Sequence, residues 1–358
     1  MKILSVVGAR PQFIKLALLS QEIRKHFKEV IVHTGQHYDV EMSRDFFDIL
    51  KIPEPDYNLS VGSMGRDEQI RKMVEGLEKI FLKEKPDLVV VFGDTNSTLA
   101  GAKAASKLGI KLAHVEAGMR SYDKIPEEIN RVGTDSLSHI FFCSTNTAVE
   151  NLEKEGITKN VFLVGDIMID ALVTTLEIAK KKSKVLGDWG LFKKDYILAT
   201  IHRAENTEDE SRLKSIIKAL ISSEEKIVIP LHPRTKKYLE ACSLFEKLKN
   251  SNVRIIRPLS YLDMLVMEEN ARKIITDSGG VQKEAYFFRV PCITLRDVTE
   301  WEETIENGFN VLVGSNEEKI NDAIKNFEIK QENKQLYGKG DASKKIADVL
   351  AKLKNKMN

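Results

Sequence analysis

Charged and small residues directly follow the short apolar runs of this 358-residue chain. In the first half these residues include Gly8-Ala9-Arg10-Pro11, Gly93-Asp94-Thr95-Asn96 and Glu116-Ala117-Gly118-Met119-Arg120. In the second half they include His202-Arg203-Ala204-Glu205-Asn206 and Asp277-Ser278-Gly279-Gly280. In open α/β sheets, ligands bind outside the carboxyl ends of the strands. The set therefore predicts a polar cleft between two facing domains.

The segment Ser278-Gly279-Gly280 is the strongest candidate for binding an anion, because it joins a strand to a helix. Glycines let a phosphate approach the backbone, and a helix N-terminus offers free N–H groups. A tight turn that merely needs glycine is the alternative interpretation. Glu284, further along the helix, is a candidate for contact with a ribose diol or for a solvated helix face. Arg10 and Lys15 flank the first turn and are candidates to neutralise a diphosphate.

Three carboxylates, those of Asp94, Glu116 and Glu127, are candidates for acid–base chemistry. Burying a carboxylate after an apolar strand costs several kcal/mol unless it is paired, so a carboxylate at such a position usually binds a partner or a ligand. The alternative is that Asp94 or Glu127 simply caps a helix. His202 also follows a strand, and it is a candidate to donate to a phosphate or to carry a proton.

The sequence lacks the residue patterns of metal and dinucleotide sites. His33 and His37 lie at a strand end rather than on one helix face, and His202 and His232 have no acidic partner at a ligand spacing. The first turn lacks the pattern G-x-G-x-x-G, and no P-loop pattern G-x-x-x-x-G-K-[ST] occurs. We therefore expect an enzyme without cofactor or metal.

The overall charge and the cysteines narrow the class of protein further. The 55 basic and 53 acidic residues leave a net charge of +2, which creates no large field for nucleic acid or an anionic membrane. No window approaches the roughly 18 apolar residues of a membrane span. Cys143, Cys242 and Cys292 are far apart and odd in number, which favours reduced thiols and a cytoplasmic location.

Short runs rich in Val and Ile alternate with longer helix-like stretches, and this order predicts the fold. The strand-like runs are 3–7, 30–33, 88–92, 112–115, 140–143 and 161–164, then 196–201, 226–230, 253–256, 273–276, 292–295 and 311–313. Continuous apolar strands between helices indicate parallel sheets covered on both faces. We predict an α/β protein with two doubly wound, Rossmann-like domains, at 1–167 and 168–341. Apolar residues at helical spacing predict a C-terminal helix over 342–357.

The ordered set of motifs closely resembles the non-hydrolysing UDP-N-acetylglucosamine 2-epimerases. The resemblance extends from residue 8 to about residue 300. It rests on Gly8-Ala9-Arg10-Pro11 with Lys15, Gly93-Asp94-Thr95, His114-Val115-Glu116-Ala117-Gly118-Met119-Arg120, Pro126-Glu127-Glu128-Ile129-Asn130-Arg131, His202-Arg203-x-Glu205-Asn206 and Asp277-Ser278-Gly279-Gly280-Val281-Gln282-x-Glu284. Each motif is modest by itself, but the order of the whole set is specific.

The resemblance implies a GT-B architecture, with the C-terminal helix at about 342–358 packing back on the first domain, and a homodimer. It also implies roles for particular residues. These are catalytic roles for Asp94, Glu116, Glu127 and His202, substrate and diphosphate contacts for Arg10, Lys15 and His202, a phosphate turn at Ser278, Gly279 and Gly280, and a ribose contact for Glu284.

Two segments depart from the bacterial pattern and resemble an archaeal-type member. Bacterial relatives carry Thr-Glu-Arg-Pro-Glu where this chain has Thr299-Glu300-Trp301-Glu302-Glu303, so the arginine contact there is missing. The run Asp39-Val40-Glu41-Met42 lacks the glutamine associated in bacteria with a second, activating substrate molecule. This difference predicts turnover without an activator.

The resemblance implies reversible epimerisation of UDP-N-acetylglucosamine at carbon 2 to UDP-N-acetylmannosamine, through elimination of UDP to a bound 2-acetamidoglucal and re-addition. Four alternatives remain open: a hydrolysing epimerase that releases free N-acetylmannosamine, an epimerase of a related UDP-diacetamido sugar, a glycosyltransferase of the same architecture, and a non-catalytic UDP-sugar-binding protein. A sensor needs the phosphate turn but not the three carboxylates, so their presence together favours an enzyme.

Overall fold

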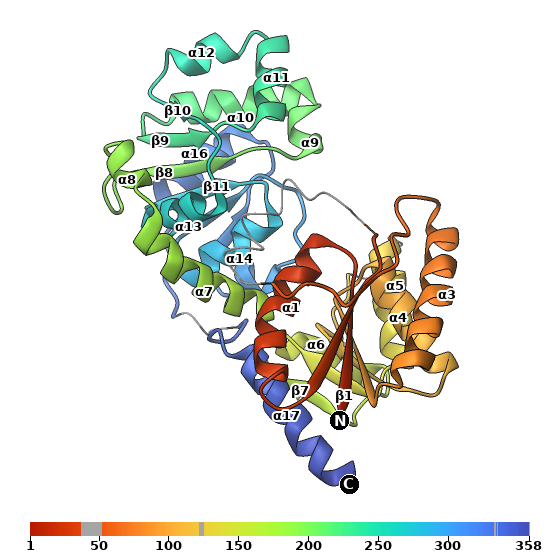
Figure 1. Ribbon diagram of the computed structural model, residues 1–358. Helices are drawn as coiled ribbons and strands as arrows, with labels where there is room; N and C mark the ends of the chain where they lie inside the picture. Colours follow the sequence, from red (N-terminus) through yellow and green to blue (C-terminus); the bar gives the residue numbers. More distant parts are fainter. Residues whose placement is uncertain (37–51, 122–124, 333, 335, 358) are drawn as a thin grey trace. The chain divides into compact units, whose positions relative to one another are not determined.

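The computed structural model describes residues 1–36, 52–121, 125–332, 334 and 336–357. The chain forms two compact α/β units, each with its own parallel sheet (Figure 1). Unit 1 comprises Met1–Thr175 and Leu336–Asn358, and unit 2 comprises Leu176–Gln335. We describe each unit by itself.

The sheet of unit 1 has seven strands among the described residues, in the order β3-β2-β1-β4-β5-β6-β7, and every neighbouring pair is parallel. The strands are β1 (Lys2–Val7), β2 (Lys28–His33), β3 (Tyr57–Asn58), β4 (Leu88–Phe92), β5 (Lys111–Val115), β6 (Ile140–Cys143) and β7 (Val161–Leu163). β4 reads Leu-Val-Val-Val-Phe and is buried throughout, as expected for a central strand covered on both faces.

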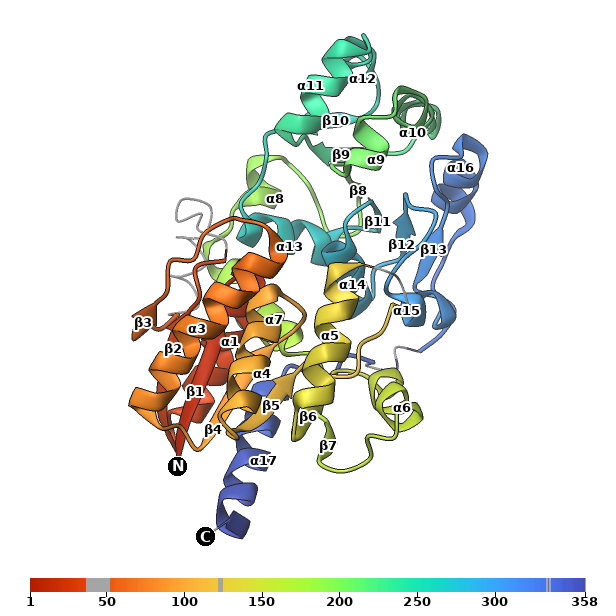
Figure 2. The ribbon, with the colours of Figure 1, turned by 90° about the vertical axis from the view of Figure 1, so that its right-hand side faces the viewer.

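Helices cover both faces of this sheet. They are α1 (Arg10–Ile23), α3 (Arg66–Glu84), α4 (Asn96–Lys107), α5 (Pro126–Leu137), α6 (Asn146–Lys154), α7 (Ile167–Lys182) and α17 (Ala342–Met357). α3, α4 and α5 lie side by side, as Figure 2 shows, and α17 packs against α1. Ile346 and Leu350 of α17 join the same buried cluster as Ile3 and Leu16, which explains the apolar stripe of this last helix.

The sheet of unit 2 has six parallel strands in the described residues, in the order β10-β9-β8-β11-β12-β13. They are β8 (Ile197–Thr200), β9 (Ile227–Pro230), β10 (Arg254–Ile256), β11 (Lys273–Thr276), β12 (Cys292–Thr294) and β13 (Asn310–Leu312). The helices are α8 (Val185–Asp188), α9 (Ala204–Thr207), α10 (Glu210–Ser222), α11 (Pro233–Ala241), α12 (Phe245–Lys249), α13 (Tyr261–Asn270), α14 (Gly279–Phe288), α15 (Glu302–Glu306) and α16 (Glu317–Asn326).

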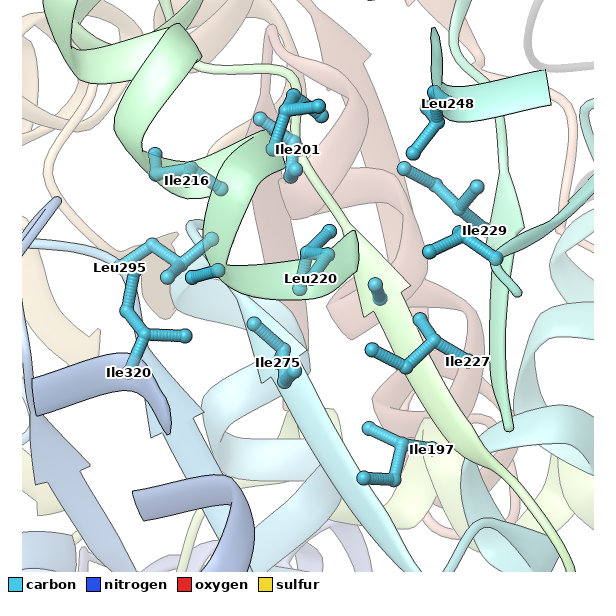
Figure 3. Close-up of a cluster of buried hydrophobic side chains, with 14 of the residues drawn as sticks. Ile197, Ile201, Ile216, Leu220, Ile227, Ile229, Leu248, Ile275, Leu295 and Ile320 are labelled. Carbon is cyan, nitrogen blue, oxygen red and sulfur yellow. The ribbon is translucent and has the colours of Figure 1, made fainter. Parts of the chain in front are cut away.

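One face of this second sheet is sealed by α10 and α16. In Figure 3, Leu220 of α10 lies over Ile275 of β11 and Ile227 of β9. Ile320 of α16 joins the same fully buried cluster. Branched aliphatic side chains of the sheet and of these helices therefore pack tightly around β8 and β11, and the polar residues described below follow these two strands.

The predicted α/β class with two doubly wound parallel sheets is confirmed. All twelve predicted runs form strands, with ends shifted by at most two residues. The two-residue strand β3 was not predicted, because Tyr57-Asn58 has neither an apolar run nor alternation. Within the described residues, no helix has the length and apolar character needed to cross a membrane.

Candidate active site

Two predicted carboxylates of unit 1 follow neighbouring strands, Asp94 after β4 and Glu116 after β5. Glu116 has a φ of +72°, a left-handed conformation that is unfavourable for a residue with a side chain. Its carboxylate forms an ion pair with Lys15 of α1. Because Lys15 is 7% exposed, this pair lies in a largely dry environment and fixes both charges in place. The structure thus brings Lys15 and Glu116 together.

Asp94 is held by residues of α5. Arg131 donates to the Asp94 carboxylate at 2.6 Å and to the Glu128 carboxylate at 3.1 Å. The Asn130 side chain donates to the backbone carbonyl of Asp94 at 2.9 Å. Asp94 remains about one-third exposed, so it is oriented by protein groups and still reaches solvent.

Glu127 and Glu128 have different environments. Glu127 is exposed in the first turn of α5, whereas Glu128 is buried and accepts hydrogen bonds from Ser121. Burial raises the pKa of the Glu128 carboxyl, but its bonds to Ser121 and Arg131 outweigh burial and keep the pKa below its usual value. Glu128 therefore serves to anchor Arg131, and Glu127 is the acid of this pair that a ligand can reach.

Neither Asp94 nor Glu127 is a helix cap, so the alternative raised for them is wrong. The N-cap of α4 is Thr95, whose hydroxyl accepts from the Thr98 backbone N–H. The N-cap of α5 is Ile125, which has no capping side chain. The capping function of these turns does not explain either acid.

In unit 2, the buried Asp277 organises the turn that carries His202. Its carboxylate accepts from the backbone N–H of His202 at 3.0 Å and of Arg203 at 3.0 Å, and from the Asn206 side chain at 3.2 Å. The Nδ1 atom of His202 lies 3.1 Å from the same carboxylate. Burial raises the pKa of Asp277, but the bonds from His202, Arg203 and Asn206 outweigh it and hold the pKa below its ordinary value. His202 is thereby oriented, while its side chain stays 42% exposed.

The predicted phosphate turn starts α14, with Ser278 as N-cap. The Ser278 side chain makes no capping bond, so the N–H groups of the first turn are not occupied by it. A Cβ atom at Gly279 would lie 2.6 Å from the Glu300 carboxylate, so a larger residue there would require the Glu300 side chain to move. At Gly280 the nearest atom to such a Cβ would be Ser278 Oγ at 3.9 Å, which leaves open space.

Charged residues after β12 surround this turn. Arg296 donates to Glu300 at 2.7 Å, and Arg203 lies 3.9 Å from the same carboxylate. Trp301, which stands where bacterial relatives have arginine, stacks under the Lys283 ammonium at 4.3 Å from the ring centroid. Cations beside the turn therefore come from Arg203, Arg296 and Lys283.

Glu284, the predicted ribose contact, belongs to a buried acidic pair. It accepts from the Tyr261 hydroxyl at 2.8 Å and contacts Glu268, which is 1% exposed. Burial raises the pKa of Glu268 well above its usual value, and the neighbouring Glu284 raises it further. Two carboxyl groups in contact share a proton, so Glu268 is the neutral donor and Glu284 the acceptor.

Other candidates from the sequence lie at the start of α1, at the end of β2, or outside the described residues. Arg10 is the first residue of α1. His33 accepts from the Gly35 backbone N–H, whereas His37 and the run Asp39-Val40-Glu41-Met42 fall in the part that the structure does not describe. Across the described ranges, no three His, Cys, Asp or Glu side chains are grouped so that they could hold a metal ion.

The roles of Arg131, Asp277 and Glu268 were missed by the sequence analysis. Arg131 and Asp277 lie inside motifs that it quotes, but spacing does not reveal that Arg131 reaches Asp94 or that Asp277 binds His202. A usable signal existed for Asp277, because a carboxylate that ends an apolar strand is buried and must have donors. No comparable signal existed for Glu268, because its place in a predicted helix is typical of an exposed charged residue.

Comparison with known proteins places these features in context. A family model described as UDP-N-acetylglucosamine 2-epimerase matches residues 21–351. A UDP-N-acetylglucosamine 2-epimerase homolog of Methanococcus maripaludis is 57% identical over 99% of this chain and 100% of its own length. The UDP-2,3-diacetamido-2,3-dideoxy-D-glucuronate 2-epimerase of Pseudomonas aeruginosa is 47% identical over 99% of this chain and 100% of its own.

A solved structure is also similar. The UDP-GlcNAc 2-epimerase of Methanocaldococcus jannaschii, in complex with UDP-GlcNAc and UDP, is 46% identical, with a TM-score of 0.80 over 98% of this chain and 100% of that one. The fold is of the GT-B type, with two parallel α/β sheets, and the family match identifies an isomerase. The chain belongs to the UDP-N-acetylglucosamine 2-epimerase family.

Proposed function

We propose that this protein interconverts UDP-N-acetylglucosamine and UDP-N-acetylmannosamine and keeps the sugar bound until UDP is re-attached. The observation that carries the proposal is the pair of oriented acids Asp94 and Glu116 on adjacent strand ends, each beside a fixed cation. A protein that only binds a UDP-sugar has no need for strained or buried acids in this unit. The 57% identity over nearly the whole chain supports the same activity.

The acids of unit 1 are proposed to move protons at carbon 2. The proton on carbon 2 is not acidic, so a carboxylate can remove it only as UDP departs from carbon 1. Asp94, Glu116 and Glu127 are the candidates for base and acid on opposite sides of the sugar. Lys15 forms an ion pair with Glu116, and Arg131 forms one with Asp94, so both carboxylates are held in place.

The polar groups of unit 2 are proposed to hold UDP and to stabilise the charge that develops as it leaves. His202, together with the backbone N–H groups of the Ser278–Gly280 turn, supplies donors that are already oriented. Arg10 of unit 1 is proposed to add a cation. Each such preorganised donor contributes on the order of 10²–10³ in rate. Glu284 is proposed to accept hydrogen bonds from the ribose hydroxyls.

A proton NMR time course with UDP-N-acetylglucosamine tests the reaction. We expect new anomeric signals of UDP-N-acetylmannosamine, in protein freed of nucleotide and treated with a chelator, because no cofactor takes part in the proposed chemistry. In D₂O, deuterium should appear at carbon 2 of both sugars. Dependence on added NAD or on a divalent metal would refute the proposal. Release of UDP and free N-acetylmannosamine would identify a hydrolysing enzyme, and binding without any change would identify a sensor.

A UDP-diacetamido uronic acid is the second candidate substrate. It is favoured by the relative from Pseudomonas aeruginosa, which is 47% identical over 99% of this chain and is named for that sugar. Such a substrate carries an additional carboxylate, which needs a cation near the sugar. The same NMR assay run with both sugars distinguishes the candidates by the ratio of their kcat/KM values.

Gly93 offers a prediction about access to the Lys15–Glu116 pair. Gly93 has a φ of +62°, and a Cβ atom there would lie 3.4 Å from both Lys15 Nζ and Glu116 Oε2. We expect Gly93→Ala to lose about 1–2 kcal/mol of stability from its left-handed backbone. We also expect its turnover to fall at least about tenfold, because the methyl group covers the pair and displaces the groups that orient around it.

Gly109→Ala is the matched control for this substitution. Its φ is +65°, and no atom of the described residues lies within 4 Å of its Cβ position. It should lose similar stability in urea unfolding and keep its turnover. Equal turnover of the two variants would show that the Lys15–Glu116 pair takes no part in the reaction.

Three expectations stay predictions: the homodimer, which the resemblance implies, the cytoplasmic location, which the cysteines favour, and the domain limits 1–167 and 168–341, which the strand pattern predicts. Turnover without a UDP-N-acetylglucosamine activator also stays a prediction, since it depends on residues 39–42, which lie outside the described part of the chain.

A further inference from the structure

A buried polar network lies directly behind the strand ends that carry Asp94 and Glu116. His114 of β5 is fully buried. Its Nδ1 atom lies 2.7 Å from the Asp135 carboxylate of α5, and its Nε2 atom lies 2.7 Å from the backbone carbonyl of Gly93. The same Asp135 carboxylate accepts from the Gly118 backbone N–H at 3.1 Å and pairs with Arg120 at 2.8 Å.

The contacts of His114 define its protonation state. A carboxylate and a backbone carbonyl can only accept hydrogen bonds, so both ring nitrogens must donate. A neutral imidazole carries only one N–H. One of the two buried acceptors would then face the lone pair of the unprotonated ring nitrogen and would lack a donor, which costs free energy. An imidazolium, with Asp135 as its counter-charge, satisfies both acceptors in this geometry.

The charged groups around the His114–Asp135 pair form opposite-charge contacts with one another. Arg120 binds Asp135 and also donates to Glu155, the C-cap residue of α6, at 2.7 Å, so His114 and Arg120 face two carboxylates. Cys143 of β6 is the other titratable group beside Asp135, and burial raises its thiol pKa to about 12, which keeps it neutral. Burial raises the pKa of Asp135, but the charges of His114 and Arg120 outweigh it and hold this carboxyl ionised.

The network connects the two turns that bear the candidate acids. The Gly93 carbonyl immediately precedes Asp94, and Glu116 lies between His114 and Gly118, two residues from each. The backbone of Glu116 is held at a φ of +72°, which costs about 1–3 kcal/mol for a residue with a side chain. Such a conformation persists only where the neighbouring backbone is fixed. Gly118 donates a hydrogen bond to Asp135, and His114 bonds to the carbonyl of Gly93, so the turns of Glu116 and Asp94 are both held in place.

We propose that His114 and Asp135 form a buried imidazolium–carboxylate pair that positions the turns of Asp94 and Glu116 for catalysis without touching the substrate. The role of the two acids in this inference rests on the proposed function. The protonation of His114 does not, because it follows from the geometry of unit 1. The two parts can therefore be tested separately.

The first test measures His114 directly by ¹⁵N NMR of histidine-labelled protein, with its signal assigned by His114→Gln. We expect both ring nitrogens of His114 to carry a proton at pH 7 in the unmodified protein. In Asp135→Asn, which removes the counter-charge with little change in shape, one ring nitrogen should carry no proton at the same pH. A neutral His114 at pH 7 in the unmodified protein overturns the proposal, whatever the substrate proves to be.

The second test measures kinetics of Asp135→Asn with the UDP-sugar that the protein turns over. We expect kcat to fall about 10²-fold, because displacing reacting groups by about 1 Å costs that much. The KM and the affinity for UDP should stay within about threefold, since the ground-state contacts of the nucleotide are unchanged. Glu155→Gln is the control, because it removes the outer, partly exposed partner of Arg120 and leaves the His114–Asp135 pair intact.

The outcomes distinguish two roles for Asp135, namely positioning the catalytic turns and stabilising the fold as a whole. A loss confined to kcat, with Glu155→Gln near normal, supports the proposal. An unchanged kcat in Asp135→Asn overturns it. Equal losses of kcat, UDP affinity and folded fraction also overturn it, because they show a purely structural role. If no UDP-sugar is epimerised at all, the proposed function fails, and the ¹⁵N measurement still decides the protonation of the pair.

Discussion

Asp94→Asn, Glu116→Gln and Glu127→Gln are each expected to lower turnover by about 10²–10⁴, the usual contribution of an acid or base. UDP affinity should change little, because the proposed contacts of UDP are the cations and the phosphate turn rather than these carboxylates. Glu116→Gln should show a further effect, since it leaves the largely buried ammonium of Lys15 without its counter-charge. We therefore expect Glu116→Gln to be the least stable of the three.

Single-turnover kinetics and calorimetry with UDP separate the two effects. Glu150→Gln on α6 is the matched control, because the Glu150 carboxylate is exposed on its helix and is not a candidate for the chemistry. It should behave like the unmodified protein in both measurements. A variant that lost UDP affinity and kept the turnover of bound substrate would show that its carboxylate is a ligand contact and neither acid nor base.

The strands could be predicted well because their physical signal is local. Runs such as Leu88–Phe92 and Lys273–Thr276 consist of residues that suit a strand buried on both faces, and both ends were predicted correctly. β3 was not predicted, because a strand of two residues that pairs with β2 at two positions is too short to show a sequence pattern. The segment at 183–190 has two glycines and several lysines, a composition typical of a linker, yet it contains α8, whose Val185 is buried against the second core. Burial of that kind depends on distant residues, which a local pattern cannot show.

The residues of the candidate site could be predicted, but their partners could not. A strand end places Asp94 or Glu116 at one edge of a sheet, and that inference needs only chain order. The pairing of Lys15 with Glu116 joins residues 101 positions apart, and that of His202 with Asp277 joins residues 75 apart. The contact of Glu284 with Glu268 required α13 and α14 to pack in one register. Such long-range contacts decide which acid is charged, and therefore which acid can act as a base.

Asp277→Asn is expected to have the largest effect on stability in unit 2. Asp277 is fully buried, and its carboxylate accepts from two backbone N–H groups and from Asn206. An amide in its place points an NH₂ group at donors, so at least one buried N–H loses its acceptor. Bonds to a charged group contribute about 1.5–3 kcal/mol each, so we expect a loss of about 3 kcal/mol in the free energy of unfolding. UDP affinity should fall at least tenfold if His202 and the Ser278–Gly280 turn hold UDP, because the donors of this turn lose their orientation.

The pH dependence of this loss tests its cause. The folded-state pKa of Asp277 lies below its ordinary value, so its stabilisation is complete above the unfolded pKa of about 3.9 and disappears as the pH falls through the folded pKa. The difference between the unmodified protein and Asp277→Asn should therefore stay constant from pH 5 to pH 8 and shrink below about pH 4. Asp297→Asn is the control, because Asp297 pairs with Arg212 at 3.0 Å but is 72% exposed, and such pairs contribute less than about 1 kcal/mol. Urea unfolding at several pH values measures both variants, and a loss at Asp277 that grew in acid would mean that its carboxylate is not the charged acceptor of the His202 turn.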